Sequence, residues 1–377
     1  MSDSFGVYVH VPFCSSRCGY CDFNTYTPGE LGGTASPESY LDALEKELEL
    51  AAASGTTRPA TTVFIGGGTP SMLGASGLTR VLSAVRNTIG IALGAEVTTE
   101  SNPETTSPEF FSELLESGYN RISLGMQSAS SSVLRVLERK HTPGRAFDAA
   151  REAMNAGFLH VNLDMIYGTP TETDDDVRLT LERALDTGVD HISAYSLIVE
   201  DGTAMARKVR KGQLPPPNED VYADRYGLID TALRAQGFDW YEVSNWAKPG
   251  GECQHNLGYW LDGDWWGAGP GAYSHIASRR FFNVKHPSTY AQHLAQGQLP
   301  IKEEELLDST ERHEESVMLG LRLRQGLELS RFTEAERAVI EKYVGLKLLH
   351  IYDGRVASTL QGRLLIDGII ADILVAY

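Results

Sequence analysis

Three of the four cysteines in this 377-residue chain lie within eight residues, at Cys14, Cys18 and Cys21, in the spacing C-x3-C-x2-C. Three thiolates can hold three irons of a 4Fe–4S cubane and leave the fourth iron without a protein ligand, whereas electron-transfer ferredoxins fill all four positions. The other interpretations are a zinc site and unrelated core cysteines. Structural zinc needs four closed ligands, and although His10 is near, this spacing is not a usual zinc motif. The sequence therefore predicts a cubane with one open iron.

An iron without a protein ligand is available to a small chelating molecule. S-adenosylmethionine (SAM) binds such an iron through its amino and carboxylate groups, and electron transfer from the cluster then cleaves its sulfonium bond. The three cysteines follow directly after an expected strand, 5–11, and Phe23 comes soon after the last of them. We therefore interpret the cysteines as ligands of a cluster that binds SAM.

The charge balance limits the classes of partner. The formal net charge is −17 at pH 7 and the pI is about 5.0, so the surface repels phosphate backbones and a nucleic-acid substrate is disfavoured. The sequence contains no run of about eighteen apolar residues, so no membrane-spanning segment is predicted. Residues 1–13 lack the basic n-region and the long apolar h-region of a signal peptide. We expect a cytoplasmic protein with reduced thiols, in which clustered cysteines indicate a metal site rather than disulfides.

Strands and helices alternate about six times over the first 240 residues, which predicts parallel strands joined by crossover helices. The expected strands are 5–11, 61–65, 96–100, 121–126, 160–166 and 191–197. The expected helical stretches are 36–53, 77–89, 107–116, 130–156, 173–187 and 219–235. Such a sheet can stay open or curl into a partial barrel, and periodicity does not choose between the two. In either case the cysteines, Gly66–Gly68, Glu100, Gln127 and Asp164 fall near the carboxyl ends of strands, where α/β folds build active sites.

The alternation of strands and helices ends at about residue 240. We expect an α/β domain over 1–240, a connecting region rich in aromatic residues and glycine over 241–305, and a small C-terminal helical domain over 306–377, of winged-helix type. The stretch 287–305 is polar and is expected to be a linker.

Several motifs, in order along the chain, resemble those of the oxygen-independent coproporphyrinogen III oxidase superfamily of radical SAM proteins. The first is Tyr8-Val9-His10-Val11-Pro12-Phe13-Cys14, with Cys21-Asp22-Phe23 at the end of the cysteine segment. The others are Ile65-Gly66-Gly67-Gly68-Thr69-Pro70, Glu100-Ser101-Asn102-Pro103, Ser123-Leu124-Gly125-Met126-Gln127-Ser128 and Asp164-Met165-Ile166-Tyr167-Gly168. The resemblance covers nearly the whole chain and implies a partial (β/α)6 barrel with a C-terminal helical domain.

The resemblance also implies a set of SAM-binding residues. They are Tyr8, Tyr20, Gly67, Gly68, Thr69, Glu100, Gln127, Arg139 and Asp164. Glycines allow close backbone approach to a ligand, Glu100 would accept from the ammonium or ribose hydroxyls, Arg139 would pair with the carboxylate, and Asp164 would bind the ribose. Without the resemblance the same residues are explained by a tight turn, a helix-capping acid and structural charges, and Tyr20 by shielding of the cluster.

A second constellation, His255-Asn256-Leu257-Gly258-Tyr259-Trp260, has the pattern H-N-x-x-Y-W and resembles a motif of the family's haem-chaperone branch. Imidazole is a common axial ligand of haem iron, and aromatic residues suit a flat macrocycle, so His255 is the haem candidate. The alternative is a core histidine on an aromatic-rich loop. Cys253 fits an inert buried thiol better than a second ligand.

Two departures bear on the function. The family's oxidases have a fourth cysteine two residues after the third, where this chain has Phe23, and an N-terminal extension that we do not expect here. The resemblance therefore implies a haem chaperone that holds haem and a SAM-ligated cluster and delivers haem to respiratory membrane proteins. A homodimer and peripheral contact with a membrane stay open. The alternative is oxidative decarboxylation of coproporphyrinogen III in porphyrin biosynthesis; an RNA-modifying enzyme is opposed by the charge.

Overall fold

The computed structural model describes residues 4–31, 35–140 and 142–377. Six parallel strands lie side by side in the order of the chain. They are β1 (Phe5–Val11), β2 (Ala60–Gly67), β3 (Ile91–Ser101), β4 (Arg121–Gln127), β5 (His160–Tyr167) and β6 (His191–Ser196). The apolar residues of these strands alternate along the chain and are buried on the face that the helices cover, as in Val63 and Ile65 of β2 and Ile122 and Leu124 of β4.

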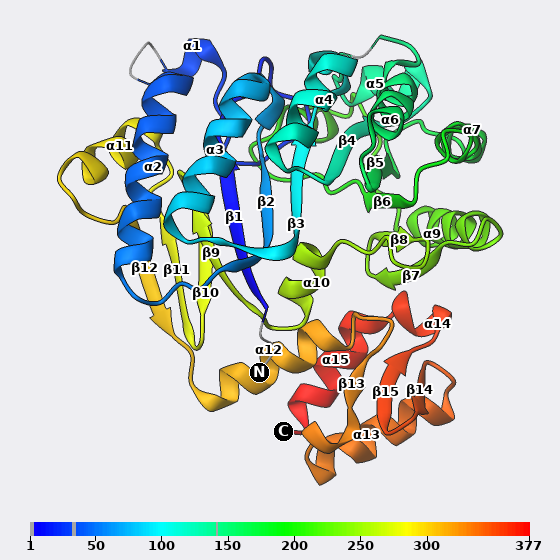
Figure 1. The fold of residues 1–377 in the computed structure, drawn as a ribbon. Helices are drawn as coiled ribbons and strands as arrows, with labels where there is room; N and C mark the ends of the chain where they lie inside the picture. The colour runs from blue at the N-terminus through cyan, green and yellow to red at the C-terminus, as the bar shows by residue number, and fades with distance from the viewer. Residues whose placement is uncertain (1–3, 32–34, 141) are drawn as a thin grey trace.

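The crossover helices cover the outer face of these strands (Figure 1). They are α2 (Pro37–Ala53), α3 (Gly74–Thr88), α4 (Pro108–Ser117), α6 (Arg145–Ala156), α7 (Asp174–Leu185) and α9 (Glu219–Arg234), with the short α1 (Pro28–Leu31) before them. The short helices α5 (Ser131–Val136) and α8 (Ala204–Arg210) instead pack together beside the cysteine segment. Single turns of 3-10 helix follow β2 at Pro70–Leu73 and β3 at Pro103–Thr105. Local signals set the ends of α2 and α4. Ser36 forms a capping box before α2, and Gly118 ends α4 with φ 111°.

The region after residue 240 extends the sheet at both edges. On one side β9 (Asp264–Ala268) pairs parallel with β1, and β10 (Tyr273–Ile276), β11 (Arg279–Asn283) and β12 (Ile301–Leu306) follow antiparallel. On the other side β8 (Asn245–Ala247) and β7 (Asp239–Glu242) extend β6. The strand order runs from β12 to β7 without closing, so the barrel is partial.

The polar stretch 287–305, expected to be a linker, holds α11 (Pro287–Ala295) and β12. That expectation was wrong because polarity is a poor guide at a sheet edge, where β12 keeps its charged side chains exposed.

The C-terminal part has its own small core. Its elements are α12 (Ser309–Gly320), β13 (Leu327–Glu328), α13 (Glu334–Gly345), β14 (Leu349–Tyr352), β15 (Arg355–Ser358), α14 (Leu360–Arg363) and α15 (Ile366–Val375), with a 3-10 turn at Leu329–Arg331. The three strands pair in the order β13-β15-β14, and the helices pack on them around Leu321, Ile340 and Ile373.

This part lies at the end of the barrel where β1–β6 begin, opposite the ends that carry the cysteine segment (Figure 1). Arg312 contacts Asp262 at 2.6 Å and Arg363 contacts Asp230 at 3.1 Å, and these ion pairs hold the two parts together. Within the ranges that the structure covers, no helix combines the length and apolar character needed to cross a bilayer.

Candidate cluster and cofactor site

The cysteine segment follows β1 at the open end of the barrel. Cys14, Cys18 and Cys21 are half-buried and face one cavity of about 650 Å³. The Thr69 hydroxyl donates to Cys14 Sγ at 3.6 Å, and Arg139 Nη1 donates to Cys18 Sγ at 3.5 Å. Burial raises the pKa of the Cys14 and Cys21 thiols, and the neighbouring thiols add to this effect.

This donor set fits a cubane better than a single zinc ion. The three sulfur atoms do not all lie within 4.8 Å of one another. Thiolates on one tetrahedral zinc, with Zn–S near 2.3 Å, lie about 3.8 Å apart. Sulfur atoms that are gathered around one cavity but separated in this way match ligands of different irons in one cluster.

The glycine run at the end of β2 is required by its approach to β1. Gly67 has φ 107°, and a Cβ there would lie 2.6 Å from ring atoms of His10. A Cβ at Gly68 would lie 2.5 Å from the carbonyl oxygen of Phe13. The amides of Gly68 and Thr69 donate to Val11 and Phe13 at 2.8 and 2.7 Å. The run therefore holds the cysteine segment against β2 and forms one wall of the cavity.

Two carboxyl groups inside the barrel have no cation to compensate them fully. Burial, with Asp164 nearby, raises the pKa of Glu100 to about 8, and burial raises the pKa of Asp164. Glu100 accepts from the Gly67 amide at 3.1 Å, while Asp164 accepts from Ser123 at 3.0 Å and Asn162 at 2.7 Å. A ligand with cationic and hydroxyl groups, such as SAM, matches what these carboxyl groups need.

Most of the residues expected to bind SAM line the cavity that the three cysteines face, which we name the outer cavity. They are Tyr20, Gly67, Gly68, Thr69, Glu100, Gln127, Arg139 and Asp164. Gln127 has φ 67°, a left-handed conformation that is uncommon for a non-glycine residue. Arg139 Nη2 donates to the Gly125 carbonyl at 3.3 Å, which fixes its guanidinium beside the cysteines.

Tyr8 and His255 lie elsewhere, on a second cavity of about 230 Å³ deeper in the barrel. The Tyr8 hydroxyl is 3.1 Å from His10 Nδ1, and Tyr8 does not line the outer cavity. Glu100, Asp164 and Tyr195 line both cavities. We name this second, deeper space the inner cavity. Its lining residues include Thr98, Arg121, Asn162, His191, Tyr241, Asn245, Cys253, His255, Asn256 and Tyr259.

His255 lies on α10 (Gln254–Trp260), which crosses the end of the barrel where the strands begin (Figure 1). Its ring is 3 % exposed, its Nδ1 is 2.8 Å from Thr62 Oγ1, and its Nε2 is 2.7 Å from the Tyr259 hydroxyl. Phe64 stacks on it at 5.2 Å. Burial lowers the pKa of His255 to about 3, so the ring is neutral, and both of its nitrogens have hydrogen-bond partners.

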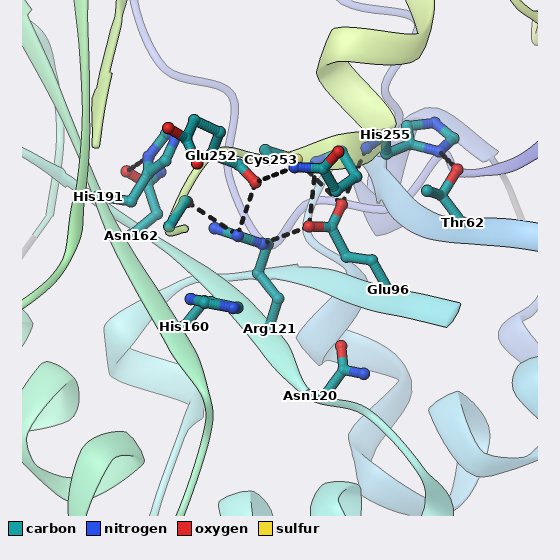
Figure 2. Close-up of polar contacts among 12 residues, drawn as sticks. Thr62, Glu96, Asn120, Arg121, His160, Asn162, His191, Glu252, Cys253 and His255 are labelled. Atoms are coloured by element: carbon teal, nitrogen blue, oxygen red, sulfur yellow. Dashed lines mark hydrogen bonds and ion pairs between the residues drawn. The ribbon is translucent and has the colours of Figure 1, made fainter. Parts of the chain in front are cut away.

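A buried ion pair that the sequence analysis missed holds this helix in place (Figure 2). Arg121 Nε donates to Glu96 Oε2 at 2.8 Å, and Arg121 Nη2 donates to the carbonyls of Gly251 and Glu252 at 2.8 and 3.1 Å. The Glu96 carboxylate accepts from the amides of Gln254 and His255 at 3.0 and 2.9 Å, which caps the N-terminus of α10.

The missed residues do leave a signal in the sequence, a polar side chain at every second position of otherwise apolar strands. The positions are Glu96, Thr98 and Glu100 on β3, Arg121 and Ser123 on β4, Asn162 and Asp164 on β5, and His191, Ser193 and Tyr195 on β6. Buried parallel strands are usually apolar on both faces, so this alternation indicates a polar interior.

Comparisons with known proteins agree with this geometry. The family model described as the radical SAM superfamily matches residues 8–184, and the HemN C-terminal domain matches residues 307–365. The chain is 55% identical over 370 residues to "Heme chaperone HemW" of Mycobacterium tuberculosis, covering 98% of this chain and 95% of the relative. It is 34% identical to the protein of the same name from Lactococcus lactis, covering 91% and 88%.

The fold itself is matched by a solved structure. "Coproporphyrinogen III oxidase (HemN) from Escherichia coli", a radical SAM enzyme, superposes with a TM-score of 0.84, covering 98% of this chain and 90% of that one. The identity is 23%, so the match concerns the fold alone. The expected α/β partial barrel with a C-terminal domain is confirmed.

Proposed function

The chain belongs to the HemW family of the radical SAM superfamily, and from this premise we propose that it is a haem chaperone, which binds haem and a SAM-ligated 4Fe–4S cluster. The observation that carries the proposal is the 55% identity, over nearly the full length of both chains, to a protein named a haem chaperone. The haem acceptors we propose are respiratory membrane proteins, reached from the cytoplasm.

In this proposal the outer cavity holds the cluster and SAM. Cys14, Cys18 and Cys21 bind three irons, and a reduced cluster with SAM bound supplies cleavage of the sulfonium bond. Arg139, fixed by Gly125, faces the SAM carboxylate, while Glu100 and Asp164 face its ammonium and ribose hydroxyls. Phe13 and His10, packed on the glycine run, keep this wall rigid.

His255 is our candidate for the axial haem ligand, under one condition set by its surroundings. Both ring nitrogens are in hydrogen bonds, to Thr62 and Tyr259, and the inner cavity is too small for a macrocycle. Coordination therefore requires α10 to move outward and one of these hydrogen bonds to break.

The second candidate function is oxidation of coproporphyrinogen III, the activity named for the solved structure that shares this fold. Phe23 stands where those oxidases have a fourth cysteine, and it is 61% exposed on the rim of the outer cavity. We place this function second because 23% identity carries no activity with it.

One pair of assays tests the proposal. Cluster-loaded protein is titrated with haem, and separately supplied with SAM, reductant and coproporphyrinogen III. We expect saturable haem binding and no protoporphyrinogen. The haem complex of His255→Ala should show a shifted or weaker Soret band, with His160→Ala as the control, because His160 is paired with Asp190 at 2.6 Å on another wall. Absence of haem binding would contradict the chaperone function, and a His255→Ala spectrum equal to wild type would place the ligand elsewhere.

A further inference from the structure

The cysteine segment, residues 14–24, is attached to the rest of the protein beside each of its three cysteines. Cys14 follows β1 closely, and its amide donates to the Tyr26 carbonyl at 3.1 Å. The Gly19 amide, beside the second cysteine, donates to the Leu137 carbonyl at 3.2 Å. Both of these attachments are made by the backbone, so the loss of a side chain does not remove them.

The attachment beside Cys21 is made by a side chain. Asn24 Nδ2 donates to the carbonyls of Pro270 and Lys285 at 3.0 and 2.9 Å. Its Oδ1 accepts from the Tyr26 hydroxyl at 3.2 Å. The amide nitrogen thus uses both of its donors, which an aspartate of the same shape could not supply.

The turn between β9 and β10 that contains Pro270 is shaped for close approach to the cysteine segment. Gly269 has φ 102°, and a Cβ there would lie 2.4 Å from the carbonyl oxygen of His10. Gly271 has φ 76°, and a Cβ there would lie 2.8 Å from Asn24 Nδ2. A side chain at either glycine would therefore push the turn away from β1 and from the amide that it receives.

The same turn is held from behind by a fully buried carboxyl group. Glu47, on α2, accepts from the Gly269 amide at 2.8 Å and from Asn283 Nδ2 at 2.7 Å. The Gly271 amide donates to the Val284 carbonyl at 3.0 Å, so the turn and the end of β11 are bonded to each other. The two carbonyls that receive the asparagine amide are therefore fixed by contacts of their own.

We propose that Asn24 is a positioning residue for the cluster, which keeps the Cys21 thiolate at the outer cavity by fastening the chain to this turn. Asp22 and Phe23 between them are exposed, so Asn24 is the anchor next to this thiolate. A thiolate that is held in place can bind its iron again after releasing it, whereas a thiolate on a loose segment moves away. The inference rests on the proposed cluster at the three cysteines.

The first test measures how fast reconstituted protein loses iron to a chelator under native conditions. Asn24→Ala should lose iron at least about fivefold faster than wild type, the equivalent of one hydrogen bond. Asn24→Asp keeps the shape of the side chain but has no donor for the two carbonyls, so it should lose iron at least as fast as Asn24→Ala. The EPR spectrum of the reduced cluster should also change, because Cys21 is displaced, and a change in global stability alone would leave that spectrum unaltered.

The matched control is Asn120→Ala, at the end of the barrel where the strands begin. Asn120 Nδ2 donates to the Ala95 carbonyl at 2.9 Å, and its Oδ1 accepts from the Val97 amide at 2.8 Å. Its loss should lower the denaturation midpoint but leave the EPR spectrum unchanged and iron loss within about twofold of wild type. Equal acceleration in the two alanine variants would overturn the proposal, as would a wild-type rate of iron loss in Asn24→Asp.

A second measurement, on cluster-free full-length protein, separates this inference from the proposed function. The backbone amides of residues 14–24 should exchange hydrogen faster in Asn24→Ala than in wild type, because their attachment is weakened. Unchanged exchange would refute the inference, whereas failure of wild-type protein to load iron would refute the cluster.

A milder variant serves if Asn24→Ala does not fold. Tyr26→Phe removes the hydroxyl that donates to Asn24 Oδ1 at 3.2 Å and to the Lys285 carbonyl at 3.3 Å. It should speed both iron loss and hydrogen exchange of the segment by a smaller factor, and wild-type rates in this variant would count against the proposal.

Discussion

The two ends of the barrel differ in how far their polar groups are satisfied. At the outer end, thiols crowd around one cavity, Glu100 and Asp164 have raised pKa values, and Gln127 adopts a left-handed backbone conformation. At the closed end, His255 has two hydrogen-bond partners and Glu96 pairs with Arg121 and the amides of α10. The outer end is thus arranged for a cofactor that completes it, whereas the polar groups around α10 at the closed end are mostly paired with one another.

This difference separates two motifs whose residue types both indicated a ligand site in the sequence. The cysteines stand where partners are lacking, so changes there should abolish binding and leave the fold intact. The H-N-x-x-Y-W segment stands where partners are present, so changes around it should first affect the free energy of unfolding.

The largest expected effect is at the cysteines. Changing Cys14, Cys18 or Cys21 to Ala should abolish loading of about four irons and four sulfides on anaerobic reconstitution, because each binds a different iron. Cys253→Ala is the control, since Cys253 is buried at the closed end and bonds Glu96 at 3.4 Å. Iron and sulfide analysis measures the outcome, and loss of the cluster in Cys253→Ala would refute the assignment.

Next in size is the buried ion pair. Glu96→Gln should lower the free energy of unfolding by about 3–5 kcal/mol, because Arg121 is left as an uncompensated buried charge. The control is Asp372→Asn, which breaks the exposed pair with Lys342 and should cost far less, because water screens the attraction between exposed charges. Denaturant unfolding measures both, and equal costs would mean that the pair does not anchor α10.

How much the sequence predicts differs between the same two ends. Periodicity predicts the six parallel strands and the crossover helices, because each is a continuous segment of the chain. Motifs at the ends of the strands predict the lining of the outer cavity, because the carboxyl ends of parallel strands meet at the same edge of the sheet. The strands that extend this sheet at its edges, β7 to β12, are not predicted in this way, because β9 joins β1 across more than 250 residues and short strands such as Asn245–Ala247 carry no period.

The Glu96–Arg121 ion pair could not be predicted from the sequence for a similar reason. Glu96 and Arg121 are 25 residues apart on two strands, and the carbonyls just before α10 that accept from Arg121, Gly251 and Glu252, are 130 and 131 residues away from it. A single charged residue in a strand is ordinarily assigned to the surface. Only the alternation of polar residues in several strands at once indicates that they face inward.

The outer carboxyl groups predict a pH effect of a few kcal/mol. The pKa of Glu100 is about 8 in the folded protein, against 4.5 as its ordinary value. The folded state therefore holds a proton that the unfolded state has already released, and stability without SAM should fall as pH rises from about 4.5 to 8, by about 1.4 kcal/mol per unit at most. Glu100→Gln should flatten the curve in that window. Denaturation midpoints at pH 5, 6.5 and 8 measure the difference, and parallel curves would contradict the raised pKa.

The smallest effect is expected at Phe23, on the rim of the outer end. The side chain is 61% exposed, and surface substitutions usually change stability by less than about 0.5 kcal/mol. Phe23→Cys restores the fourth cysteine of the oxidases, yet the three existing thiols already leave one iron open for SAM, so the iron content should stay near four. We expect no conversion of coproporphyrinogen III, with Phe23→Ser as the control for loss of the ring. Appearance of protoporphyrinogen in Phe23→Cys alone would show that one rim residue separates chaperone from enzyme and would move the decisive difference to the outer end.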